Sequence, residues 1–240
     1  MQILYHDEYF VAVNKPAGLL VHRSRIDKHE TRFALQIVRD AIGRRVYPVH
    51  RLDKPTSGIL LFALQPDAAA AMMSLFEAAQ VEKTYVAVVR GYTDEHGEID
   101  YPLQERLDKM TDALADQNKP AKPAVTRYRR LAAIELPISV GRYQTSRYSL
   151  LQATPLAGRK HQIRRHMKHI FHPIIGDTTY GDGVHNKMFR EQFACHRLLL
   201  HAQSLAFPHP YLNRPVNISA PLDNDFEHIC RRFSWNVCIQ

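Results

Sequence analysis

The chain has 240 residues, of which 45% are hydrophobic, and this is enough to bury a substantial core in one large domain or two small ones. Its net charge of +8 favours a polyanionic partner, either a nucleic acid or an anionic membrane surface. The absence of an 18-residue apolar run, of a secretory signal and of any Cys-x-x-Cys pair argues against a membrane-spanning, exported or disulfide-rich protein and indicates a cytoplasmic one.

The first elements in chain order are a hairpin and a helix. Apolar runs at residues 3–5 and 9–13 flank a polar turn, which predicts two antiparallel strands. Asn14-Lys15-Pro16-Ala17-Gly18 then ends the second strand with turn-forming residues. Residues 30–43 carry an apolar stripe at helical spacing, and Gly43 is placed to end that helix.

The next stretch places a carboxylate over a buried strand. Residues 46–53 are expected to be extended, and the apolar run at 59–64 is typical of a strand buried on both faces. Lys54-Pro55 and Ser57-Gly58 supply the break and the turn between them. Asp53 therefore has a rigid mount suited to a reactive group. The alternative is that Asp53 only caps the turn, with Arg51 as its surface ion partner.

The rest of the chain alternates strands and helices. The periodicity predicts a helix over 67–80 capped by Asp67, strands over 81–91, 126–131 and 148–153, a helix over 163–170, strands over 197–210 and 215–221, and a helix over 225–235. Residues 104–125 are the least core-like stretch and are expected to be a surface insertion or a mobile loop. Because strands outnumber helices and are often hairpin-linked, we expect one α+β domain over residues 1–240, with helices flanking a mostly antiparallel mixed sheet.

Two basic stretches favour a nucleic acid as the partner. Residues 141–147 interleave Arg with Tyr, a composition that suits RNA contact by charge and stacking but also a solvated hairpin. Arg159 and Lys160 precede a helix whose residues Ile163 and Met167 face inward. Basic side chains are unfavourable at a helix N-terminus unless phosphates bind there.

Four histidines close to this helix raise the alternative of a metal site: His161, His166, His169 and His172. The stretch contains no His-Glu-x-x-His motif and no nearby cysteine, and its Arg and Lys residues would repel a divalent cation. We therefore expect no metal ion here.

Several motifs occur in the order found in one enzyme family. They are Asn-Lys-Pro-Ala-Gly at 14–18, His-Arg-Leu-Asp at 50–53 followed by Thr-Ser-Gly at 56–58, Lys-Thr-Tyr at 83–85 with Gly91, and Gly-Arg-Lys-His-Gln-Ile-Arg at 158–164. Together they resemble the motifs of pseudouridine synthases, in the branch typified by the large-subunit ribosomal RNA enzyme A. The resemblance spans roughly residues 3–210, and the family's appended S4-like RNA-binding module is not expected, because the motifs begin within the first residues.

The resemblance implies roles for three catalytic residues. Asp53 would be the catalytic carboxylate, Arg164 would pair with it, and Tyr85 would stack on the target base and assist proton removal. On residues alone, a strand tyrosine is more often a core residue with its hydroxyl satisfied.

The same resemblance implies a substrate-binding set. Ile163 would line the base pocket, and Arg51 would fill the gap left by a flipped nucleotide. Lys15 would contact a phosphate or serve in packing. Arg159, Lys160 and His161 complete the set.

The implied reaction breaks the N-glycosidic bond of a uridine in RNA, rotates the base and rejoins it through carbon. Asp53 would act as a nucleophile at C1′ or as a base at C2′, and the sequence leaves both open. An isomerisation needs no redox partner, so we expect no cofactor and no required protein partner. The 142–148 segment, the 159–166 segment and the Phe233-Ser234-Trp235 ending are similar to those of tRNA-modifying members acting in the T-arm stem, with ribosomal RNA as the alternative substrate.

Two other classes of function are considered. A retaining glycosidase also uses a carboxylate at C1′, but it needs a second carboxyl about 5 to 5.5 Å away, and the motifs contain no partner acid. A non-catalytic RNA-binding protein would explain the charge but not the ordered motifs.

Overall fold

The structure is a computed structural model, and it describes residues 1–22, 31–104 and 120–235. Its strands are β1 (Gln2–His6), β2 (Phe10–Lys15), β3 (Tyr47–Pro48), β4 (Ser57–Ala63), β5 (Glu82–Arg90), β6 (His96–Asp100), β7 (Val125–Leu136), β8 (Ser146–Pro155), β9 (Leu200–Pro208) and β10 (Pro215–Ser219). Its helices are α1 (Ala34–Ile42), α2 (Pro66–Glu77), α3 (Gln162–His169), α4 (Gly183–Phe193) and α5 (Asn224–Arg232).

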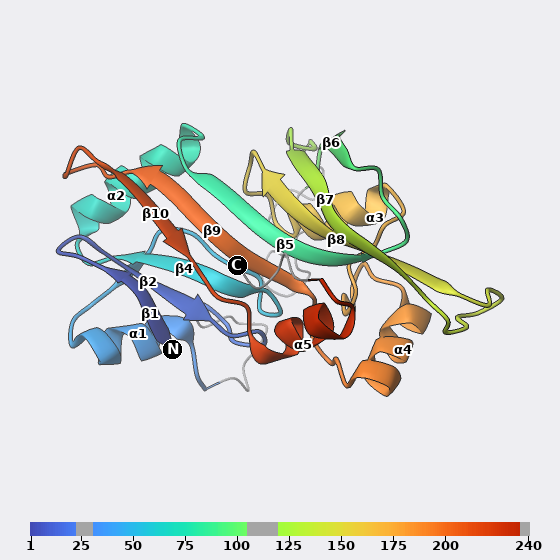
Figure 1. The fold of residues 1–240 in the computed structure, drawn as a ribbon. Coiled ribbons are helices and arrows are strands. Elements are labelled where there is room, and N and C mark those ends of the chain that lie inside the picture. Colours follow the sequence, from blue (N-terminus) through green and yellow to red (C-terminus); the bar gives the residue numbers. More distant parts are fainter. Residues whose placement is uncertain (23–30, 105–119, 236–240) are drawn as a thin grey trace.

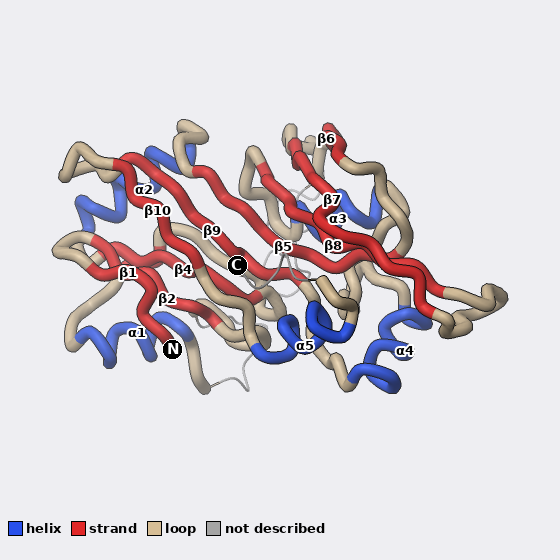
Figure 2. The backbone as a smooth tube through the Cα atoms, in the orientation of Figure 1, coloured by secondary structure: helices blue, strands red, loops and turns tan. Residues whose placement is uncertain are grey.

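The strands form one twisted sheet with helices around it (Figures 1 and 2). The strand order is β1-β2-β4-β9-β5-β8-β7-β6, with β10 pairing with β9 and β3 with β4. Within the described residues, the pairing of β4 with β9 is parallel and every other named pairing is antiparallel. The prediction of an α+β fold on a mostly antiparallel mixed sheet is confirmed.

The parallel pair joins the two halves of the sheet through a close backbone approach. All seven residues of β4 are buried, as its continuous apolar run predicts. Ser57 and Gly58 pair with His201 and Ala202, and Gly58 has a φ of +109°. A Cβ atom at Gly58 would lie 2.2 Å from the carbonyl oxygen of Ala202. Glycine is therefore required both by the space and by the backbone conformation.

Residue alternation along the sheet separates two packed faces. Leu200 and Ala202 of β9 face the same side, where they join the apolar clusters of α3 and α1. Leu199 joins the cluster of α4 and α5 on the other side, and Leu205 joins that of α2. Asp53 directly precedes β4, and α3 covers the other half of the same face, so segments far apart in sequence converge over the middle of the sheet.

Most predicted elements are confirmed, with boundaries shifted by a few residues. The helix expected from Asp67 begins at Pro66, with Gln65 at the N-cap position and Asp67 in the first turn, so the capping assignment was wrong. Within residues 46–53, which were expected to be extended throughout, only β3 is a strand; the remainder is loop, with bends at Val49 and His50. Strand β6 and helix α4 were not predicted.

The expected insertion at 104–125 falls mostly outside the described residues. The structure does describe its edges, where Leu103 forms an isolated bridge with Lys122 and β7 begins at Val125. In the described parts of the chain, no helix combines the length and the apolar character needed to cross a membrane.

The packing at Gly58 generates a prediction about stability. Gly58→Ala should lower the free energy of unfolding by more than about 3 kcal/mol, because the new methyl group meets backbone atoms that cannot rotate away and the φ is positive. Gly183→Ala is the matched control, since a Cβ there meets nothing within 4 Å and alanine favours the first turn of α4. Urea denaturation of both variants measures the difference. Equal stabilities would show that β4 and β9 can separate without cost.

Candidate active site

Asp53 lies in a loop that is fastened from two sides. Its carbonyl oxygen accepts a hydrogen bond from the Thr56 amide at 3.0 Å, which closes the turn before β4. The carbonyl oxygen of Lys54 accepts one from the Gly18 amide at 2.8 Å, which ties the loop to the turn after β2. The Asp53 side chain is 25% exposed, so its carboxylate is held by a fixed backbone while it faces solvent.

The first partner of this carboxylate is a buried guanidinium. Arg164, in the first turn of α3, is 4% exposed and donates from Nη1 to Oδ2 of Asp53 at 3.1 Å. Its Nε and Nη2 donate to the two carboxylate oxygens of Asp177 at 2.7 and 2.9 Å. The predicted pairing of Asp53 with Arg164 is therefore present in the structure, and a second carboxylate orients the guanidinium.

Asp177 is fixed in turn by hydrogen bonds from the backbone. Its Oδ1 also accepts the backbone amides of Thr179 and Tyr180, each at 2.9 Å. Burial opposes the charge of both groups. The hydrogen bonds and the opposite charge outweigh burial, so the pKa of Asp177 is lowered and that of Arg164 is raised. The Arg164–Asp177 pair is thus a charged buried unit with one guanidinium nitrogen directed at Asp53.

His161 is the second side chain that faces the Asp53 carboxylate. Its Nε2 lies 3.7 Å from Oδ1 of Asp53, and its Nδ1 lies 3.0 Å from the Tyr180 hydroxyl. His161 is the N-cap residue of α3 and has a φ of +57°, a left-handed backbone conformation. Tyr180 also places its ring 5.1 Å from the Arg164 guanidinium carbon. Burial lowers the pKa of His161 against the opposing effect of the Asp53 charge.

Tyr85 occupies the centre of the sheet beside this group. It pairs with Ala153 of β8 and Ala202 of β9, and its ring packs against the clusters of both α1 and α3. Burial, and then the charge of Asp53, raise the pKa of Tyr85. At neutral pH this residue is therefore a neutral phenol near Asp53. Ile163, buried in the same cluster, supports the ring from α3.

Lys15 is buried and bound to backbone carbonyl groups, which is not the environment that a phosphate contact requires. Its side chain is fully buried, and Nζ donates to the carbonyl oxygens of Pro16, Leu19 and Lys54 at 2.9, 2.9 and 3.2 Å. Burial, aided by the Arg197 charge and opposed by that of Asp53, lowers the pKa of Lys15 to about 7. This geometry favours the packing role, in which Lys15 holds the Asp53 loop against the turn after β2.

The remaining predicted substrate-binding residues lie on the surface around the site. Arg51, Arg159 and Lys160 are exposed. Arg159 donates to the Pro123 carbonyl at 3.3 Å, and the Lys160 charge acts on His161. All three therefore offer basic groups on the exposed surface of the segments that carry Asp53 and His161.

The other histidines of the α3 region have structural partners. His166 is buried, with Nδ1 2.9 Å from the Thr126 hydroxyl and Nε2 3.0 Å from the Tyr101 carbonyl oxygen. The ring of His169 stacks on Tyr101 with centroids 3.8 Å apart. Among the residues that the structure describes, no three His, Cys, Asp or Glu side chains gather as a metal site would require.

Sequence reasoning missed a polar cluster that lies beneath the Asp53 loop. Arg197 donates to the Ser57 hydroxyl at 2.9 Å, and this hydroxyl lies 2.8 Å from Nδ1 of His201. The Nε2 of His201 faces the Ala220 carbonyl oxygen at 3.3 Å, so Nε2 carries the proton and Ser57 donates to Nδ1. Burial lowers the pKa of His201 to about 4 and that of Arg197 to about 10. Asp177 and Tyr180 were also missed as site residues; their turn was predicted, but not that it folds back onto α3.

Comparison with known proteins supplies the family context. The family described as RNA pseudouridylate synthase matches residues 9–169. The chain is 55% identical over 235 residues to "tRNA pseudouridine synthase C" of Vibrio cholerae, covering 98% of this chain and 96% of that one. It is 50% identical over 235 residues to the protein of the same name from Haemophilus influenzae, covering 98% of each.

Two solved human structures share the fold. "Human RNA Pseudouridylate Synthase Domain Containing 4" has a TM-score of 0.71 at 26% identity, covering 97% of this chain and 93% of that one. "Human RNA Pseudouridylate Synthase Domain Containing 1" has a TM-score of 0.70 at 26% identity, covering 92% and 83%.

The buried pair predicts a large stability cost on removal of one charge. Asp177→Asn should lower the free energy of unfolding by about 3 to 5 kcal/mol, because it removes the buried counter-charge of Arg164 and leaves the partly exposed Asp53 carboxylate as its ion partner. The exposed Arg127–Glu98 pair is the control, and Glu98→Gln should change stability by less than about 1 kcal/mol. Chemical denaturation at neutral pH measures both. A cost for Asp177→Asn as small as that of the control would contradict the proposed importance of this pair.

His201 predicts a pH dependence of stability. Its pKa of about 4 in the folded protein lies below the ordinary value of 6.5, so the unfolded chain binds the extra proton between these values. The contribution of neutral His201 to the free energy of unfolding is complete above pH 6.5 and falls by about 2 kcal/mol on acidification to pH 5. His201→Asn, whose side-chain oxygen can still accept from Ser57, should lose less stability between pH 7.5 and pH 5 than the parent. Denaturation curves at both pH values measure this.

The control for that experiment is the exposed His96. His96→Asn should keep the pH dependence of the parent protein. Burial also lowers the pKa of His50 to about 4, so His50 adds to the loss of stability at low pH. This effect is the same in the parent and both variants and therefore does not alter the difference between them. Identical pH dependence in His201→Asn and the parent would rule out a neutral buried His201.

Proposed function

Because this chain belongs to the RNA pseudouridylate synthase family, we propose that it converts a uridine of tRNA into pseudouridine, with Asp53 as the catalytic residue. The observation that carries the proposal is the carboxylate of Asp53, partly open to solvent and bound at 3.1 Å by a guanidinium that Asp177 orients. Substrate choice follows the relatives, which are named for tRNA. Within tRNA, we place the target in the stem region of the T arm.

The reaction is balanced as an isomerisation. The bond between C1′ and N1 of the uridine breaks, a bond between C1′ and C5 forms, the C5 proton leaves and N1 gains a proton. The Asp53 carboxylate suits attack at C1′ or proton removal at C2′, and both need its negative charge. The Arg164 guanidinium supports that charge and directs one carboxylate oxygen, while the other faces His161.

Tyr85 is proposed to bind the detached base as a neutral phenol. Its raised pKa disfavours a phenolate, so its hydroxyl is better suited to donate a hydrogen bond than to remove a proton as a base. Its ring, supported by Ile163, offers a flat apolar face on which uracil can stack while it rotates.

His161 is proposed to position the substrate and the carboxylate together. The Tyr180 hydroxyl holds one ring nitrogen, which leaves the other directed at Asp53. Lys160 and Arg159, exposed beside it, suit the phosphates of a bound strand. The net charge of +8 is in keeping with such a partner, and tRNA as substrate implies a cytoplasmic protein.

The assignment of Asp53 predicts a separation of catalysis from binding. Asp53→Asn should lower pseudouridine formation at least about 10⁴-fold, because an amide has neither the nucleophilicity nor the basicity of the carboxylate. The dissociation constant for tRNA should stay within about threefold, since the amide keeps the size of the side chain. Pseudouridine mapping and filter binding on tRNA from cells lacking the enzyme measure the two quantities. Asp40→Asn, an exposed residue of α1, is the control and should react like the parent.

The same mapping tests the substrate. Product in the T arm of tRNA supports the proposal, whereas product only in ribosomal RNA would replace the substrate and keep the chemistry. Pseudouridine made by Asp53→Asn at the parent rate would refute the role of Asp53.

A further inference from the structure

Phe171 is an exposed aromatic residue in a backbone conformation that aromatic residues rarely adopt. Its side chain is 79% exposed and its φ is +63°. It directly follows the last turn of α3, where its amide donates to the Lys168 carbonyl at 3.0 Å. A left-handed residue often ends a helix in this way, but glycine or asparagine does so without the cost of about 1 to 2 kcal/mol that other residues incur. The ending of the helix therefore does not explain why this residue is a phenylalanine.

The neighbouring structure holds this residue outward on a rigid base. Arg90, the last residue of β5, donates from Nη2 to the Phe171 carbonyl at 3.3 Å. Its Nη1 pairs at 2.5 Å with Asp182, the N-cap residue of α4. The His172 ring nitrogen Nδ1 lies 2.8 Å from the Arg90 carbonyl oxygen. Phe171 is thus presented by an ordered junction of β5, α3 and α4.

A second exposed ring lies on the hairpin that pairs with the strand of the same arginine, where Tyr148 is opposite Arg90. Tyr143, at the tip of the β7–β8 hairpin, is 60% exposed, and the Arg142 guanidinium lies 5.1 Å from its ring centroid. Arg142 also donates from Nη2 to the Tyr143 hydroxyl at 3.0 Å, and this bond and the charges of Arg142 and Arg90 lower the pKa of Tyr143. We call Phe171, Tyr143, Arg142 and Arg90 the Phe171 surface.

A further aromatic and arginine pair borders this surface. The Arg147 guanidinium lies 5.3 Å from the ring centroid of exposed Tyr92, directly after β5. The carboxylates nearby, Asp182 and Glu135, pair with Arg90 and Arg147. Figure 1 shows the β7–β8 hairpin extending past the sheet at this end, opposite β1 and β2. Exposed rings alternating with guanidinium groups match the pattern by which proteins bind unpaired nucleotides.

The surface also lies at a suitable place relative to Asp53. Helix α3 begins at the site, where Arg164 contacts Asp53, and ends at His169, two residues before Phe171. A rise of about 1.5 Å per residue from Arg164 to His169 spans about 8 Å along the helix axis. A strand whose target nucleotide occupies the site can therefore reach the surface with neighbouring parts of the same RNA.

We propose that the Phe171 surface binds unpaired nucleotides of the substrate RNA, with bases stacked on Phe171 and Tyr143 and phosphates bound by Arg142. This inference rests on the proposed function for the identity of the RNA. It adds a contact outside the catalytic centre, by which a folded RNA with unpaired nucleotides is preferred over a plain duplex.

The test separates stacking from folding by choice of substitution. Phe171→Asn removes the ring but suits the left-handed conformation, so the melting temperature should be kept. Combined with Tyr143→Ser, it should weaken tRNA binding about 10-fold or more, as expected for the loss of stacked bases. Filter binding is done in the Asp53→Asn background, where no product forms. In the catalytically intact protein the same pair should raise KM and leave kcat unchanged.

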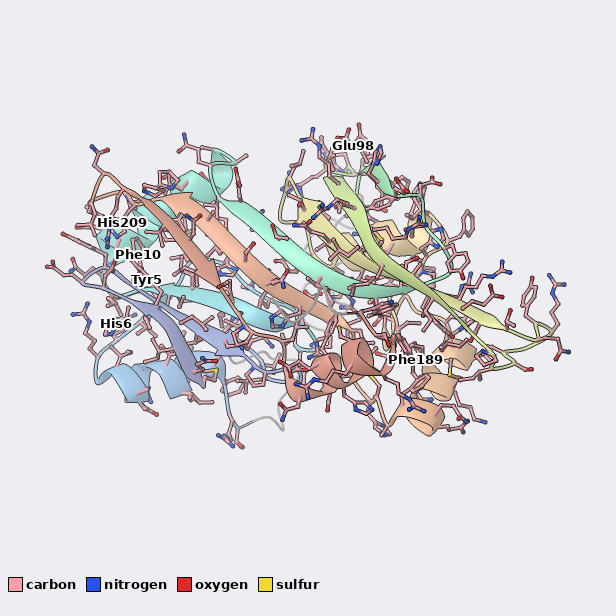
Figure 3. The ribbon with its side chains drawn as sticks, viewed as in Figure 1. Tyr5, His6, Phe10, Glu98, Phe189 and His209 are labelled. Atoms are coloured by element: carbon pink, nitrogen blue, oxygen red, sulfur yellow. The ribbon has the colours of Figure 1, made fainter. Side chains whose placement is uncertain are left out.

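Tyr211→Ser is the matched control. Tyr211 is an exposed tyrosine that stacks on Tyr9 and whose amide donates to His209, a residue labelled in Figure 3 at the end of the sheet opposite the β7–β8 hairpin. It should bind tRNA like the parent. An RNA duplex with the target uridine and no unpaired nucleotides should bind the double variant and the parent equally.

The outcomes distinguish this inference from the function on which it rests. An unchanged tRNA affinity of the double variant, with a parent enzyme that makes pseudouridine in tRNA, would overturn the Phe171 surface alone. Equal weakening on tRNA and on duplex would overturn the preference for unpaired nucleotides. A parent protein that makes no pseudouridine would overturn the proposed function instead. Unchanged RNA binding with loss of a copurifying protein would assign the surface to a protein partner and refute the inference.

Discussion

The structure depends on a guanidinium buried between two carboxylates. Arg164 uses Nε and Nη2 for Asp177 and Nη1 for Asp53, so its side chain has one orientation before any substrate is bound. A buried charge without partners would be expelled or neutralised, and Asp177, with its two additional backbone amides, prevents this. Preorganisation of this kind removes the need to reorient charged groups during the reaction. The pair also fixes the first turn of α3 and, through it, the positions of His161 and Ile163.

The site lies where the two halves of the sheet meet. The Asp53 loop belongs to the half with β1, β2 and β4, whereas Arg164 and Tyr85 belong to the half with β5, β7 and β8. The halves are joined by the short parallel pairing of β4 with β9, in which Gly58 touches the backbone of Ala202. Below that junction, Arg197 donates a hydrogen bond to the Ser57 hydroxyl, which in turn bonds to His201. A separation of the halves by a single side-chain width would break the contact of Asp53 with Arg164.

Sequence patterns predicted the elements better than their long-range partners. The buried strand at β4 and the inward face of α3 followed from periodicity, because side-chain spacing reports local structure. The contact of Asp53 with Arg164 spans 111 residues and was inferred from family resemblance, since no local pattern encodes it. Asp177 was not predicted as a site residue because an aspartate in a turn commonly accepts hydrogen bonds from nearby backbone amides. Asp177 does accept such bonds, from the amides of Thr179 and Tyr180. Helix α4 was missed although Asp182 caps it, since glycine, histidine and asparagine weaken the helical signal.

Burial sorts the charges of the site into two kinds. Groups without a buried counter-charge have pKa values that favour the neutral form: Tyr85 as the phenol and His201 as the free imidazole. Arg164 and Asp177 keep their charges because each supplies the counter-charge of the other. Within the described residues, Lys15 has only carbonyl oxygens as hydrogen-bond partners, and its pKa of about 7 means that it is partly charged and partly neutral at neutral pH. The face of the site therefore combines the partly solvent-accessible Asp53 carboxylate with neutral rings, an arrangement that fits the role proposed for Asp53.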